Sequence, residues 1–197
     1  MNKKHKMFLA FIILVDILIP IFILLIKPLF EYKFYILTGI GAFLYSLTRI
    51  LKIPHSKLGI TKNNIIDSLK NCAILNIILI VVIIVFLLFS FNRFTPNESW
   101  LFYIFYIFIS CPIQEFLYRG IFGYFDQLTS QKYIWVITSS ILYSFVHIIY
   151  GDILTIIGTF VLGMLWYMAY QKNYNLLGVV LSHVILGILT ISLGIIN

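Results

Sequence analysis

Long apolar runs separated by short polar segments dominate the pattern along this chain. A helix needs about 20 mostly apolar residues to cross the hydrocarbon core of a bilayer. Several runs reach that length, so the pattern predicts an all-α, polytopic transmembrane helical bundle with about seven spans. The predicted spans are Met7–Ile26, Phe34–Leu51, Cys72–Phe91, Trp100–Phe125, Tyr133–Tyr150, Ile153–Tyr170 and Leu176–Ile196.

The fourth run is the longest, and it contains Pro112. Proline removes a backbone donor and clashes inside a helix, so we expect this run to tilt or break near Pro112, which would give about eight elements. No soluble domain, repeat or low-complexity linker interrupts the apolar runs. We therefore expect one integral membrane domain over residues 1–197.

Composition and charge agree with a chain that lies in lipid. Hydrophobic residues make up 61% of it and charged residues 11%, whereas soluble domains are closer to half apolar and a quarter charged. The net charge of +7 does not indicate nucleic-acid binding, because most cations lie between the spans. One side of the predicted bundle holds Lys3, Lys4, Lys6, Arg49, Lys52, Lys57, Lys62, Lys70, Lys132 and Lys172. The positive-inside rule then predicts a cytoplasmic N-terminus. The richness in Ile, Asn and Lys is typical of an AT-rich bacterial genome, so we expect a multi-pass protein of the bacterial inner membrane.

The segment Lys52–Lys70 alternates basic residues with aliphatic ones. Two interpretations fit this alternation: an interfacial segment on the anionic inner leaflet, or an ordinary basic loop. Both place the segment on the cytoplasmic side of the membrane.

Few ionisable side chains fall inside the predicted spans, and each needs a partner or a wet cavity because its charge is costly in lipid. They are Asp16, Glu115, Arg119, His147 and His183. Glu115 and Arg119 are four residues apart and share a helix face, so we expect them to pair. Asp16 has no evident partner, and we interpret it as structural.

Three spans bring polar groups to a similar depth once helix tilt is allowed for. Glu115, with Gln114 beside it, lies on the fourth span; His147 ends a polar stripe on the fifth, and His183 begins a stripe of small or polar residues on the last. Such stripes normally face other helices. Two imidazoles near a carboxylate and a guanidinium favour a functional site over isolated buried histidines.

The motifs in this half of the chain resemble those of a known family. The stretch from Cys111 to Gly120 (CPIQEFLYRG) resembles the first motif, EExxxR, of the CPBP family of CAAX proteases and bacteriocin-processing proteins, also called Abi. The segment Tyr143–His147 is similar to its second motif, FxxxH, and the region ending at His183 to its final histidine motif. The resemblance covers about residues 100–190, so we expect a motif-bearing core over residues 100–197.

The resemblance implies a helical intramembrane endopeptidase that acts on a membrane peptide or a lipidated or pheromone-type peptide. On that basis Glu115 and His147 activate water and His183 polarises the carbonyl, while Gln114, Arg119 and Tyr143 support them. A carboxylate or imidazole in a low-dielectric cavity is suited to general-base chemistry. A divalent metal such as zinc, with Glu115, His147 and His183 as ligands, stays an open alternative.

Two positions depart from the family pattern. Gln114 stands where the family has its catalytic glutamate, and an amide cannot accept a proton. Gly187 stands where the family has an asparagine. A second hypothesis therefore remains: a non-catalytic relative that acts as a bacteriocin self-immunity protein or binds membrane peptides. A transporter is the third reading, although no inverted repeat supports it.

Overall fold

The computed structural model describes residues 1–89 and 93–195, and every element in those residues is helical. The α-helices are α1 (Lys3–Leu25), α2 (Lys33–Ile50), α3 (Ile65–Leu88), α4 (Trp100–Phe105), α5 (Cys111–Glu115), α6 (Phe122–Thr129), α7 (Lys132–Phe145), α8 (Ile153–Gln171) and α9 (Leu176–Ser192). The 3₁₀ or π segments are η1 (Lys27–Tyr32), η2 (His55–Leu58), η3 (Tyr106–Ser110), η4 (Phe116–Ile121) and η5 (Val146–Tyr150). The predicted all-α class is confirmed for this part of the chain.

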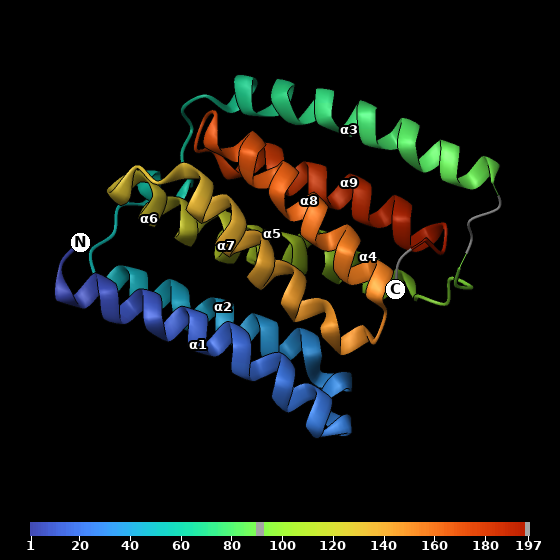
Figure 1. Cartoon of the computed structure of the whole chain (residues 1–197), viewed down its shortest axis with the longest axis horizontal. Helices are drawn as coiled ribbons and strands as arrows, with labels where there is room; N and C mark the ends of the chain where they lie inside the picture. The colour runs from blue at the N-terminus through green and yellow to red at the C-terminus, as the bar shows by residue number, and fades with distance from the viewer. Residues whose placement is uncertain (90–92, 196–197) are drawn as a thin grey trace.

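The long helices lie side by side along the long axis of the molecule (Figure 1). Helix α7 packs along α8, and α3 packs along α9. Helices α1 and α2 form one side of the bundle, and α3 forms the other (Figure 1). The run from α4 to α6 passes between them, where α5 contacts α2 and α9 and η4 contacts α7. The run Trp100–Thr129 carries the CPIQEFLYRG motif and is called the motif helix. It is therefore enclosed by other helices.

Five helical stretches in the described residues are long and apolar enough to cross a membrane. They are Lys3–Leu25, Ile65–Leu88, Trp100–Thr129, Lys132–Tyr150 and Ile153–Gln171. Helix α9 is apolar but shorter, and α2 falls outside this group. The prediction of a multi-pass membrane protein is confirmed. The described residues hold five helices of spanning length, whereas the sequence pattern predicts about seven spans. The predicted ends Phe91 and Ile196 lie outside the described residues.

The bundle is apolar outside and partly polar inside. Helix α3 exposes Ile74, Ile77, Ile78 and Val81. The buried polar side chains include Asp16, Asn76, Ser110, Glu115, Arg119, Ser139, Ser140, Ser182 and His183. This distribution suits a lipid solvent, because lipid offers no hydrophobic driving force between helices and polar contacts help to hold them together.

Of the two outcomes expected at Pro112, a break is wrong, and a tilt of the fourth span stays a prediction. The span continues as one helical run from Trp100 to Thr129, with π-helical segments on both sides of α5. Pro112 lies in the first turn of α5, directly after the π segment η3. Proline is tolerated at the start of a helix, where its missing N–H matters little. A π segment absorbs the irregular spacing without interrupting the helix.

The basic segment Lys52–Lys70 is divided between two structures. Its first part is a loop that contains η2, and its last residues, from Ile65, form the first turns of α3. Leu58 in η2 is fully buried, whereas Ile66 on α3 is exposed. The segment is therefore not one continuous interfacial element.

Candidate functional site

The ion pair expected from sequence spacing is present in the middle of the bundle. Glu115 and Arg119 are fully buried, and Arg119 Nη1 donates to Glu115 Oε1 at 3.2 Å. Arg119 Nη2 donates to the backbone carbonyl of Gly163 on α8 at 3.2 Å. The guanidinium carbon lies 4.5 Å from the ring centre of Tyr143 on α7. Arg119 therefore joins the motif helix to both neighbouring spans.

His183 on α9 shares the same carboxylate oxygen. Its Nδ1 lies 2.7 Å from Glu115 Oε1, and its Nε2 lies 3.3 Å from the Tyr143 hydroxyl. The imidazole stacks on Trp166 with ring centres 4.5 Å apart. A hydrogen bond from Nδ1–H to a carboxylate fixes the ring orientation and tautomer, as in the pairs that support catalytic histidines. His183 is thus held on three sides.

His147 is oriented by the backbone rather than by a side chain. Its Nδ1 lies 2.7 Å from the carbonyl oxygen of Tyr143, one turn earlier. Because a carbonyl only accepts, Nδ1 carries the proton and Nε2 is left as the basic nitrogen. The Tyr143 ring lies 4.9 Å from the His147 ring and 5.9 Å from the His183 ring. Tyr143 therefore contacts both imidazoles.

One cavity brings several of the sequence-predicted groups together. Gln114, His147 and His183 line it, and Lys33 and Glu98 also line it. Tyr143 is a further lining residue, whereas Glu115 and Arg119 do not line this cavity. The carboxylate therefore acts on the cavity through His183, to which it is hydrogen-bonded.

Two side-chain oxygens near this cavity have no hydrogen-bond partner among the described residues. Gln114 Nε2 donates to Ser110 Oγ at 2.8 Å, which leaves Gln114 Oε1 buried and unpaired. Glu115 Oε2 is likewise buried and unpaired. An unsatisfied buried acceptor is costly unless a donor reaches it. Gln114 Oε1 belongs to a residue that lines the cavity, so it is able to accept from a water molecule or a substrate N–H there, whereas Glu115 lies behind the cavity wall.

The absent asparagine at position 187 has a structural explanation. A Cβ atom at Gly187 would overlap the hydroxyl of Tyr106 on the motif helix. The buried Tyr106 lines the cavity, and its ring lies 5.9 Å from that of His183. Sequence reasoning missed Tyr106, although it begins a stripe with Ser110 and Gln114 at four-residue spacing. A tyrosine therefore occupies the space beside the final histidine.

A second polar chain supports His183 and was also missed. Trp166 Nε1 donates to Ser182 Oγ at 2.8 Å, and Ser182 Oγ in turn donates to Asn76 Oδ1 on α3. This chain fixes the indole that stacks on His183. The signal available in the sequence was Asn76, a lone amide within an apolar run.

Glu115, His147 and His183, the candidate ligands of the metal alternative, do not form a ligand set in the described residues. Among the described residues, no group of three or more His, Cys, Asp or Glu side chains could hold a metal ion. Glu115 Oε1 is occupied by Arg119 and His183, and His147 Nδ1 is directed to a backbone carbonyl.

Comparison with known proteins matches the motif-bearing part of the chain. Residues 96–189 match the family model described as type II CAAX prenyl endopeptidase Rce1-like. No curated protein and no solved structure matches the chain. The matched segment runs from just before α4 to within α9, and it contains Gln114, Glu115, His147 and His183. The family predicted from the motifs is confirmed over these residues.

Proposed function

Because residues 96–189 belong to the Rce1-like family of type II CAAX prenyl endopeptidases, we propose that this chain is an intramembrane endopeptidase. It hydrolyses a peptide bond in a membrane-associated or lipidated peptide. The main support is the cavity that has both imidazoles, the Tyr143 hydroxyl and Gln114 in its walls. This set provides a base, hydrogen-bond donors and a substrate-binding acceptor within one enclosed space.

His147 is the general base of the proposed reaction. Its Nε2 is the basic nitrogen, because Nδ1–H is directed to the Tyr143 carbonyl. It takes a proton from water as the water oxygen attacks the scissile carbonyl carbon. When the C–N bond then breaks, the same nitrogen returns the proton to the leaving amine. Gln114, as an amide, does not compete for this role.

His183 and Tyr143 stabilise the oxygen of the tetrahedral intermediate. Because His183 Nδ1–H is directed to Glu115, Nε2 of the neutral ring accepts from the Tyr143 hydroxyl, 3.3 Å away. His183 therefore positions this hydroxyl, which turns to donate to the developing negative oxygen. Donors fixed in advance near the developing charge lower the barrier without reorganisation. Glu115 is a positioning residue in this scheme, because it touches His183 and not the cavity.

Gln114 binds rather than catalyses. Its unpaired Oε1 accepts a hydrogen bond from the attacking water or from a substrate amide, while Ser110 holds its amide nitrogen. We expect this contact to help orient the peptide bond toward His147.

Cleavage by the purified protein in lipid nanodiscs tests this proposal. We would compare a farnesylated CAAX-type peptide with unmodified membrane peptides, using His147→Ala, His183→Ala and Glu115→Gln. We expect the His147 variant to lose cleavage, and the other two to lose most of kcat while they remain folded. His55→Ala is the matched control, because His55 is exposed and lies outside the cavity. Cleavage that survives the loss of both His147 and His183 would rule out this site.

A second candidate function is a non-catalytic relative that binds membrane peptides or confers bacteriocin self-immunity. Gln114 and Gly187, which replace the family's glutamate and asparagine, favour it. Gln114→Glu separates the two functions. If only this variant cleaves, the natural chain is a binding protein; if the natural chain cleaves as well, it is an enzyme.

A further inference from the structure

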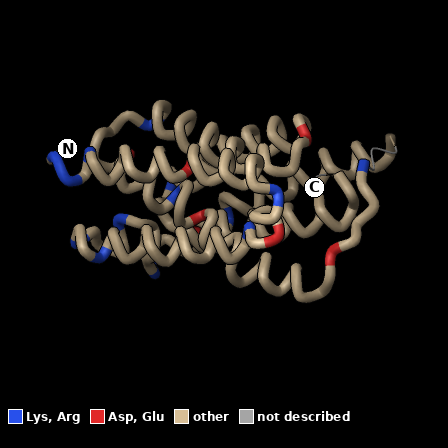
Figure 2. Tube along the Cα trace, turned by 90° about the horizontal axis from the view of Figure 1, so that it is seen from below, with Lys and Arg blue, Asp and Glu red and all other residues tan. Residues whose placement is uncertain are grey.

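The two ends of the bundle differ sharply in charge. The end that contains the N-terminus also contains the connections after α2, α6 and α8, and the opposite end contains η1 and the start of α4 (Figure 1). Ten cations lie in segments at the N-terminal end: Lys3, Lys4, Lys6, Arg49, Lys52, Lys57, Lys62, Lys70, Lys132 and Lys172. Three lie at the opposite end: Lys27, Lys33 and Arg93. Figure 2 shows blue segments gathered near the N-terminus.

The mouth of the cavity lies at the end that is poor in cations. Lys33 begins α2, Glu98 precedes α4, and Tyr150 ends η5; all three line the cavity. Glu98 is exposed. No lining residue comes from η2 or from the connections that follow α6 and α8. The lining residues of this cavity therefore connect His147 and His183 with the cation-poor end of the bundle.

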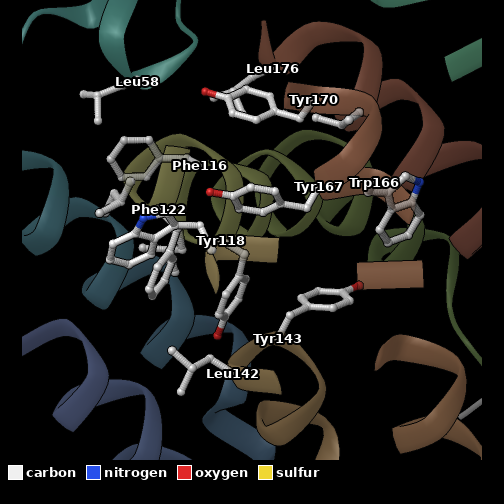
Figure 3. Close-up of a cluster of buried hydrophobic side chains, with 14 of the residues drawn as sticks. Leu58, Phe116, Tyr118, Phe122, Leu142, Tyr143, Trp166, Tyr167, Tyr170 and Leu176 are labelled. Atoms are coloured by element: carbon white, nitrogen blue, oxygen red, sulfur yellow. The ribbon is translucent and has the colours of Figure 1, made fainter. Parts of the chain in front are cut away.

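The opposite way out of the cavity is closed by packed side chains. Tyr167 and Tyr170 follow the cavity-lining Trp166 toward the end of α8, and together with Phe122 they are almost fully buried in the cluster shown in Figure 3. Gly123 packs so tightly against Tyr170 that a Cβ there would overlap the phenol ring. Such dense packing closes the space between α6 and the end of α8.

We infer that the cavity opens to the extracytoplasmic face, so that the proposed endopeptidase takes exported or lipidated peptides that arrive from outside. The claim that peptides are cleaved rests on the proposed function, whereas the direction in which the cavity opens rests on charge and geometry alone. Segments rich in Lys and Arg stay in the cytoplasm. His147 lies three residues before the end of η5, so the cleavage site is roughly 6 Å below that helix end.

Cysteine accessibility in intact cells tests the direction of the opening. Glu98→Cys places a thiol at the mouth, and Lys62→Cys places a matched thiol in the exposed basic loop. The native cysteines, Cys72 and Cys111, are buried, so the parent chain is the labelling control. A membrane-impermeant maleimide should label the Glu98 variant in intact cells and the Lys62 variant only after permeabilisation. The reverse pattern overturns the inference.

Vesicles of opposite sidedness test the delivery of substrate. The same farnesylated CAAX-type peptide is added to right-side-out and to inverted membrane vesicles that contain the protein. Cleavage should be seen in the right-side-out vesicles and lost in the inverted ones. Cleavage only in inverted vesicles overturns the inference. If neither preparation cleaves, the proposed enzyme activity fails while the maleimide result still decides the sidedness.

Discussion

At the scale of single residues, the ion pair between Glu115 and Arg119 carries a large desolvation cost. Both side chains are fully buried, and the carboxylate also holds His183. Desolvating two charges is expensive, and removing one partner leaves the other charge uncompensated. The pair is therefore weak evidence of added stability, but the loss of one member alone should lower the free energy of unfolding.

Arg119→Met should lower the free energy of unfolding by about 3–5 kcal/mol, because it leaves the Glu115 carboxylate buried without its cation. Reversible unfolding in mixed micelles measures the change. Adding Glu115→Gln should recover much of the loss by removing the unpaired charge. Equal stability of the single and double variants would contradict this argument.

Gly187→Ala should destabilise the protein by about 1–3 kcal/mol, because the added methyl group overlaps the Tyr106 hydroxyl and must displace a well-packed ring. The same change made in a Tyr106→Ala background should cost much less, and the double-mutant cycle measures that coupling. Gly158→Ala is the control, since a Cβ there meets nothing within 4 Å. Equal costs at positions 187 and 158 would contradict the overlap.

At the scale of elements, the start of α8 is tied to two distant segments. Asp152 is the N-cap of α8, and its side chain accepts from the backbone N–H of Thr155 at 2.9 Å. Arg93 Nη1 donates to Asp152 Oδ2 at 3.0 Å and to the carbonyl of Ile195 at 3.3 Å. This contact joins the entry to α4, the start of α8 and the end of α9 close to the cavity mouth.

The hydrogen bond from Arg93, with help from Thr155, lowers the pKa of Asp152 below its usual value. A carboxyl with a depressed folded pKa contributes stability above its unfolded pKa of about 3.9, and that contribution is lost as pH falls toward the folded value. Asp152→Asn keeps an N-cap but loses the charge. Its stability deficit should be constant above about pH 5 and should shrink below about pH 4, as measured by denaturation at a series of pH values. A deficit that grows at low pH would contradict the assignment.

Sequence reasoning succeeded where the signal was local. Apolar runs predict helices, and four-residue spacing predicts the pair of Glu115 and Arg119, because both depend only on helix geometry. Contacts between distant segments gave a weaker signal: similar depth predicted that His183 and Glu115 share a site, but not which atoms meet. His183 meets Glu115 across 68 positions, and the Tyr118 hydroxyl reaches Asp16 Oδ1 across 102, at 3.4 Å. Asp16, which had no evident partner in the sequence, therefore acquires one only when the helices pack.

At the scale of the whole molecule, lipid surrounds the outside of the bundle and water is expected in the cavity. Exposure of a side chain therefore has the opposite meaning from that in a soluble protein. Ile78 on α3 is 56% exposed but faces the direction in which lipid surrounds the bundle. Thr190 on α9 is 8% exposed but lines the cavity, whose mouth carries Lys33 and Glu98. An exposed side chain in the middle of a span therefore contacts lipid, while a buried one beside the cavity contacts water.

Thiol labelling should follow this reversed order. Thr190→Cys should react with a small, water-soluble methanethiosulfonate in proteoliposomes, because thiolate chemistry needs water around the sulfur. Ile78→Cys should stay unreactive toward the same reagent. When its thiol is instead labelled with a bimane that enters from the lipid, nitroxide-labelled lipid should quench the bimane fluorescence. The parent chain, whose two cysteines are buried, gives the background. If the Ile78 thiol reacted with the aqueous reagent and the Thr190 thiol did not, the cavity would be dry and α3 would face water. A dry cavity could not supply the attacking water molecule, so the peptidase proposal would fall with it.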